Sequence, residues 1–155
     1  MALANDVKPT PNDVVITPSI IDPHSAGTLG GAVTVHEPYG VVAGISAYNY
    51  PLLINMTKLA PALVSGNCLV LKPSPLTPFS ALLLGKIADE AGLPKGVLNI
   101  VTGGADVGAA LTNDPRVDLI SFTGSDTVGA NIVEQSAKNL KKVHLELGGK
   151  SAMIV

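Results

Sequence analysis

Three short apolar runs decide the fold class: CLVL at residues 68–71, LNIV at 98–101 and LISF at 119–122. Apolar residues dominate these runs, as they do in strands that are covered on both faces of a parallel sheet. Segments with the apolar spacing of helices lie between the runs, at 79–91 and 105–111. The alternation predicts an α/β fold, a parallel sheet with flanking helices, with ligands bound at the carboxyl ends of the strands.

The other expected elements continue this alternation. We expect further strands at 33–36, 41–46, 143–147 and 152–155, and helices at 51–65 and 126–137. Pro61 lies inside the first of these helices and is expected to kink or split it. Residues 1–32 are rich in Pro, Asn, Asp, Ser and Gly, with one short apolar run at 14–16. They are predicted to form a linker or extended arm ahead of a domain at 33–155.

The composition excludes several classes of protein. Of the 155 residues, 46% are hydrophobic and 14% are charged, which is far from the composition of disordered chains. A net charge of -2 and an aromatic content of 3% argue against nucleic-acid binding. The lone Cys68 excludes a disulfide framework, and the apolar stretch 52–64 is too short and too interrupted to span a bilayer. Without a basic and apolar leader, the protein is expected to be soluble and cytoplasmic, with no membrane or metal partner.

Three glycine-rich turns follow predicted strands and resemble phosphate-binding loops to different degrees. GGADVG at 103–108 has Ala105 where the dinucleotide fingerprint has its second glycine, so it fits an imperfect fingerprint or a tight strand-to-helix turn. The turn after LISF ends in Ser125, which fits both phosphate binding at a helix N-terminus and an ordinary N-cap. GGKS at 148–151 has His144 in place of the first glycine of a P-loop, which excludes a nucleotide triphosphatase.

Five motifs occur in an order that points to a family. They are PYGVVAGISAYNYP at 38–51, GNCLVLKPSPLTP at 66–78, GLPKGVLNIVTG at 92–103, FTGS at 122–125 and LELGGKSA at 145–152. This series resembles the aldehyde dehydrogenase superfamily from about Val33 to Val155. The resemblance implies a Rossmann-like domain that is a truncated portion of the aldehyde dehydrogenase fold. It also implies a homo-oligomeric parent protein that oxidises a small-molecule aldehyde to a carboxylic acid, through a cysteine thioester, with NAD or NADP.

Two catalytic residues are implied by the resemblance. Asn49 matches the family's oxyanion asparagine, whose uncharged amide donates a hydrogen bond to a developing alkoxide. Glu146 matches the general base, and its place in an apolar strand predicts partial desolvation. The family's nucleophilic cysteine comes later in sequence than Val155, so this chain alone is expected to be inactive. Cys68, inside a predicted strand, is expected to be a small buried hydrophobe.

The resemblance implies coenzyme binding by a larger set of residues. Lys72 matches a lysine that contacts the adenosine ribose, and Gly124 and Ser125 match the pyrophosphate-binding turn. The full implied set is Ile45, Ser46, Ala47, Tyr48, Lys72, Ser74, Pro75, Gly103, Gly124, Ser125, Val128 and Leu147. The chain departs from the family at Pro75, where a ribose-binding glutamate is common. We therefore expect NADP to be tolerated, because no carboxylate at this position repels its 2′-phosphate.

Two alternative functions stay open. A stand-alone, non-catalytic dinucleotide-binding module would keep the coenzyme residues without any oxidation. An acylating dehydrogenase would pass the acyl group to coenzyme A instead of water. Glu146 favours hydrolysis over the second alternative, since water needs a base.

Overall fold

The computed structural model describes residues 15–17, 32–34 and 36–149. The chain divides into two compact units, Met1–Pro38 and Tyr39–Val155. In the first unit, β1 (Val15–Thr17) pairs with β2 (Ala32–Thr34) in an antiparallel two-stranded sheet. The apolar run at 14–16 overlaps β1, and the strand expected at 33–36 overlaps β2. The strand expected at 152–155 lies outside the described residues.

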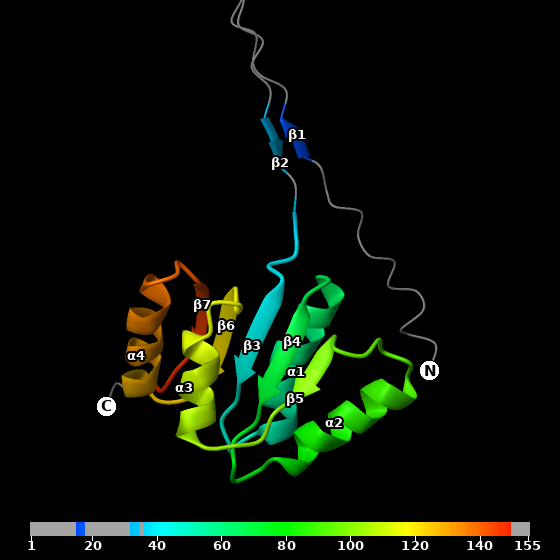
Figure 1. The fold of residues 1–155 in the computed structure, drawn as a ribbon, viewed down its shortest axis with the longest axis vertical. Helices are drawn as coiled ribbons and strands as arrows, with labels where there is room; N and C mark the ends of the chain where they lie inside the picture. The colour runs from blue at the N-terminus through cyan, green and yellow to red at the C-terminus, as the bar shows by residue number, and fades with distance from the viewer. Residues whose placement is uncertain (1–14, 18–31, 35, 150–155) are drawn as a thin grey trace, which may run out of the picture. The chain divides into compact units, whose positions relative to one another are not determined.

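A five-stranded parallel sheet forms the second unit, in the order β5-β4-β3-β6-β7 (Figure 1). The strands are β3 (Val41–Ile45), β4 (Cys68–Lys72), β5 (Leu98–Ile100), β6 (Leu119–Thr123) and β7 (Lys142–Glu146). The helices are α1 (Pro51–Val64), α2 (Phe79–Glu90), α3 (Ala105–Asn113) and α4 (Asp126–Ala137). Each helix connects one parallel strand to the next, so the predicted α/β class with a Rossmann-like sheet is confirmed.

Side chains alternate between the two faces of the sheet and build two apolar clusters. The cluster on the α3 and α4 face has the buried members Ala43, Ile45, Val117, Ile120, Phe122 and Ile132. The cluster on the α1 and α2 face has the buried members Val42, Ala62, Leu69, Leu71 and Ala81. Figure 1 shows α3 and α4 side by side on their face of the sheet. Burial on both faces explains why apolar residues dominate these strands.

Pro61 was expected to kink or split α1, and the split does not occur. The helix runs unbroken from Pro51 to Val64. Pro61 has no N–H to donate within the helix, and the neighbouring Ala62 is buried in the cluster on this face. The helix ends instead before Gly66, whose φ of 78° is left-handed and whose N–H donates to the Leu63 carbonyl.

The strand order reverses between β3 and β6, and this reversal determines where a ligand can bind. From β3 the chain passes through α1 to β4 on one side of the sheet, and from β6 it passes through α4 to β7 on the other. Because α1 and α4 cover opposite faces, the loops that follow β3 and β6 diverge. A crevice is expected at such a point, at the carboxyl ends of the two strands. Ile45 and Phe122 are register partners there.

Candidate functional site

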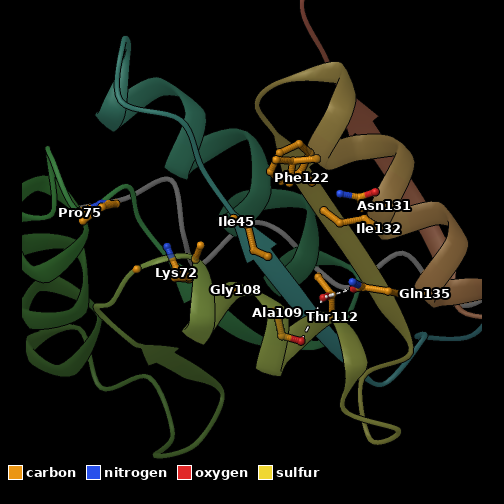
Figure 2. Close-up of a pocket in the computed structure, with 13 residues that line it drawn as sticks. Ile45, Lys72, Pro75, Gly108, Ala109, Thr112, Phe122, Asn131, Ile132 and Gln135 are labelled. Carbon is orange, nitrogen blue, oxygen red and sulfur yellow. Dashed lines mark hydrogen bonds between the residues drawn. The ribbon is translucent and has the colours of Figure 1, made fainter.

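An apolar cavity of about 370 Å³ lies between α3 and α4 at the carboxyl edge of the sheet (Figure 2). The strands contribute Ile45, Lys72 and Phe122 to its lining, and Pro75 follows β4. The helices contribute Gly108, Ala109 and Thr112 from α3, and Val128, Asn131, Ile132 and Gln135 from α4. The Thr112 hydroxyl donates to Gln135 Oε1 at 2.7 Å and joins the two helices beside the cavity. The cavity is therefore a mostly apolar slot with a lysine at one end.

Lys72 is the charged group of this cavity. It ends β4, and only 5% of the residue is exposed. Burial lowers the pKa of Lys72, while the charge of Asp106 in the first turn of α3 raises it. Its Nζ donates to the Pro73 carbonyl at 3.3 Å. An ammonium has three N–H donors, so Lys72 has capacity left to bind hydroxyl or phosphate oxygens of a ligand.

Buried polar contacts hold the loop that follows β3. The Ser46 N–H donates to the Lys72 carbonyl at 3.1 Å, and the Ser46 hydroxyl donates to Asn55 Oδ1 at 2.5 Å. Asn55 is fully buried in α1. Asn49 follows this anchored segment, is exposed, and borders a surface groove at the start of α1 together with Leu53. An amide in this position is available to a ligand that approaches the carboxyl edge.

Glu146 ends β7 and is not desolvated, contrary to the expectation. Its side chain is 67% exposed, and Oε1 lies 3.6 Å from His144 Nε2. The reason is the alternation along β7: Val143 and Leu145 pack on the α4 face, whereas His144 and Glu146 point to the opposite face. β7 is also an edge strand of the sheet formed by the described residues. The apolar neighbours of Glu146 in sequence therefore do not surround its carboxylate.

Lys58 belongs to α1, and its side chain reaches β6, the strand that pairs with β7. Only 3% of the residue is exposed, and its Nζ donates to Thr123 Oγ1 at 2.8 Å and to Ser121 Oγ at 3.3 Å. Burial lowers the pKa of Lys58 to about 8, while the charge of Glu146 raises it. Thr123 is the register partner of Glu146, so this buried ammonium is placed near the exposed carboxylate.

The turn after β6 starts α4 with a side-chain cap. The Ser125 hydroxyl accepts the Val128 N–H at 3.4 Å, so the N-cap interpretation of this serine is confirmed. Gly124 is needed because a Cβ there would lie 2.3 Å from Cζ of Phe122. The first-turn N–H groups of α4 thus face the carboxyl edge of the sheet, where helix termini attract anions.

The structure gathers part of the predicted coenzyme set in one cavity. Ile45, Lys72, Pro75 and Val128 line it. The other predicted residues follow the carboxyl ends of the strands but lie outside that lining: Ser46, Ala47, Tyr48, Ser74, Gly103, Gly124, Ser125 and Leu147. Two of them have evident structural roles, since Ser46 bonds to Asn55 and Ser74 Oγ accepts the Leu76 N–H at 3.3 Å.

Cys68 starts β4, at the amino edge of the sheet, whereas Asn49 and Glu146 lie at the carboxyl edge. One strand length, roughly 13 Å for four residue steps, separates the two edges. Cys68 is therefore not placed to act with the other two. Within residues 36–149 no cluster of three metal-ligating side chains occurs. No helix among the described residues is long and apolar enough to cross a membrane.

A model of the aldehyde dehydrogenase family matches residues 19–155. The chain belongs to the aldehyde dehydrogenase family. It is 55% identical over 122 residues to 4-trimethylaminobutyraldehyde dehydrogenase of Homo sapiens, with 79% of this chain and 25% of that enzyme covered. The family resemblance inferred from the five motifs is thereby confirmed.

Solved structures of aldehyde dehydrogenases share the fold. An aldehyde dehydrogenase of Mycobacterium tuberculosis complexed with NAD+ gives a TM-score of 0.77 at 46% identity, with 82% of this chain and 26% of that chain covered. An NADP dependent enzyme of E. coli gives 0.74 at 49% identity, with 76% and 24% covered. The chain thus spans about a quarter of the length of the relatives that it matches.

Sequence reasoning missed two buried polar residues of the candidate site, Asn55 and Lys58. Both appeared only as interruptions of the apolar stretch 52–64. Polar side chains on the buried face of a helix need partners, and that need was the signal available in the sequence. The identity of the partners, Ser46 for Asn55 and Thr123 for Lys58, depends on contacts between separate elements.

The pKa of Lys58 predicts a pH dependence of stability. The pKa is about 8 in the folded protein and 10.5 for an ordinary lysine, so between these values the unfolded chain binds the proton more strongly. Stability should therefore rise with pH across this window in the wild type relative to Lys58→Met, by on the order of 2–3 kcal/mol. Urea denaturation of both proteins at several pH values measures this difference in the free energy of unfolding. Lys86→Met, at an exposed position, is the control; a Lys58→Met difference that is constant with pH would contradict the assignment.

Proposed function

We propose that this chain is the coenzyme-binding part of an NAD(P)-dependent aldehyde dehydrogenase that converts an aldehyde and water to a carboxylic acid. The observation that carries the proposal is the apolar cavity at the strand-order reversal, with the buried Lys72 at its end. Residues 33–155 are assigned to this binding domain and residues 1–32 to a linker or arm. The proposal includes a cytoplasmic, homo-oligomeric parent protein whose nucleophilic cysteine lies outside this chain.

The cavity fits the adenosine end of a dinucleotide. Its walls offer apolar contact for a flat base, as ligand cavities commonly do, and Lys72 offers free N–H donors for ribose hydroxyls. The Ser125-capped start of α4 offers N–H groups to the pyrophosphate. When bound, the coenzyme supplies the acceptor for the hydride that leaves the aldehyde carbon.

Asn49 and Glu146 are assigned to the chemistry at the aldehyde carbon. The Asn49 amide donates a hydrogen bond to the oxygen that becomes an alkoxide when the cysteine thiolate adds to the carbonyl. Glu146 takes a proton from the water that releases the acid from the thioester. The exposure of both side chains leaves them free to contact a substrate. The Lys58 ammonium lies near Glu146, whose charge raises the pKa of Lys58 against the effect of burial.

Coenzyme titration of the 155-residue chain tests the binding half of this proposal. Quenching or enhancement of NADH fluorescence should give a saturable isotherm. Lys72→Met should weaken binding by about 10- to 100-fold, since a hydrogen bond from a buried charged donor is lost. Lys95→Met, an exposed lysine, should leave the affinity unchanged. An isotherm that Lys72→Met does not alter would remove Lys72 from the site.

The choice between NAD and NADP is tested at Pro75, which lines the cavity. The proposal is that both coenzymes bind, because no carboxylate stands at this position. Pro75→Glu should lower the affinity for NADP about tenfold more than the affinity for NAD, by repulsion of the 2′-phosphate. Pro75→Gln has a similar size without the charge and is the matched control. A wild-type chain that binds NAD but not NADP would refute the tolerance of NADP.

The catalytic half of the proposal is tested in the protein expressed from the full-length reading frame. Asn49→Ala should lower kcat by about 10²–10³-fold, the usual loss when an oxyanion donor is removed. Glu146→Gln should slow release of the acid while the first reduction of coenzyme still occurs as a burst. Stopped-flow absorbance at the NADH band separates the two phases. If the encoded protein binds coenzyme but contains no nucleophile, the non-catalytic dinucleotide-binding module is the better description. If release of the product requires coenzyme A, the acylating dehydrogenase is the better description.

A further inference from the structure

Two hydrogen bonds attach the backbone around Glu146 to the start of α4. The Glu146 carbonyl accepts the Gly124 N–H at 3.1 Å. Two residues later, the Gly148 N–H donates to Asp126 Oδ1 at 3.1 Å. The second contact joins positions 22 residues apart and comes from a side chain in the first turn of α4. Both contacts lie just after Glu146 in the chain, so this end of β7 is attached to the turn before α4 and to its first residue.

A side-chain contact also joins the segment after Glu146 to α4. The Leu147 side chain lies so close to Gly129 that a Cβ at that glycine would be 2.7 Å from Leu147 Cδ2. This contact brings the side chain that follows Glu146 against the first turn of α4.

Asp126 is not required to cap its own helix. Ser125 already occupies the N-cap position and accepts the Val128 N–H. A carboxylate in the first turn commonly stabilises a helix through the helix dipole, and that role needs no particular direction of the side chain. The Asp126 carboxylate instead makes a directed hydrogen bond to Gly148. This contact fastens a separate segment of the chain.

The Asp126–Gly148 contact lies just beyond the end of β7. The ladder between β6 and β7 stops at the Thr123–Glu146 pair, and β7 is the last strand of the described sheet. The Glu146 side chain is mostly exposed, and its Oε1 lies 3.6 Å from His144 Nε2. Its position is therefore set by its backbone more than by packing around the carboxylate.

We propose that Asp126 is a positioning residue for the general base: through Gly148 it holds Glu146 in register with the turn that receives the coenzyme pyrophosphate. The inference rests on the proposed function, because it takes Glu146 as the base and the start of α4 as the pyrophosphate site. It makes the coenzyme turn and the base a single unit, so that the start of α4 serves both binding and chemistry. Asp126 itself touches neither substrate nor coenzyme in this role.

Two substitutions separate the hydrogen bond from the charge. Asp126→Asn keeps an acceptor oxygen at the same reach and removes the negative charge. Asp126→Ser remains compatible with the start of a helix but is too short to reach Gly148. Asp89→Ser, at an exposed position on α2, is the control for loss of an aspartate.

In the full-length enzyme, Asp126→Ser should lower kcat by about tenfold, while the dissociation constant of NAD stays within about twofold, because the base is misplaced and the coenzyme turn is intact. Asp126→Asn and Asp89→Ser should keep kcat within about twofold of the wild type. A damaged α4 would weaken NAD binding together with kcat, so the split between the two identifies positioning. Equal losses in Asp126→Asn and Asp126→Ser would overturn the inference, since the charge would then be the cause.

Hydrogen exchange at the Gly148 amide tests the contact without coenzyme. In the 155-residue chain, Asp126→Ser should raise the exchange rate about fivefold or more, and Asp126→Asn should leave it near the wild-type rate. An unchanged rate in Asp126→Ser overturns the inference whether or not coenzyme binds. If Asp126→Ser exchanges faster but the wild-type chain binds no coenzyme, the contact is real and the proposed function fails, and the positioning role fails with it.

Discussion

β3 and β6 are neighbours in the sheet, yet the chain leaves them toward opposite faces, and the site depends on this divergence. The cavity with Lys72 lies on the face of α3 and α4. Lys58 approaches from α1 on the other face, where Glu146 also points. A ligand that contacts both groups must therefore pass over the carboxyl edge between the two strands. An extended molecule with two chemically different ends meets this requirement better than a compact one.

The two buried lysines are the costly features of the structure. Each has a pKa lowered by burial, so each loses hydration free energy that folding alone does not recover. Methionine of similar length would fill either position without that cost. Lys58 is partly compensated by two hydroxyl acceptors, whereas the hydrogen bond of Lys72 is to the carbonyl of the next residue. The weaker compensation at Lys72 is consistent with a group whose remaining partners come from a ligand.

Sequence patterns were sufficient for the sheet and its helices, because burial on both faces leaves an apolar signature in each central strand. They failed where the environment of a residue depends on another element. Glu146 was expected to be desolvated from its neighbours in sequence, but strand alternation and the edge position of β7 expose it. Asn55 and Lys58 looked like interruptions of an apolar helix, and only the contacts with Ser46 and Thr123 show their place. Pro61 was expected to kink or split its helix, but α1 is continuous from Pro51 to Val64.

The two edges of the sheet use their polar residues differently. At the amino edge, Asn67 Oδ1 accepts the Gly40 N–H at 2.9 Å, and Asp118 Oδ2 accepts the Val41 N–H at 2.8 Å. These side chains complete the backbone hydrogen bonding where β3 begins. At the carboxyl edge, Lys72 keeps unused donors, and Glu146 is exposed beyond the end of its ladder. Cys68 belongs to the amino edge and therefore lies a strand length away from both Lys72 and Glu146.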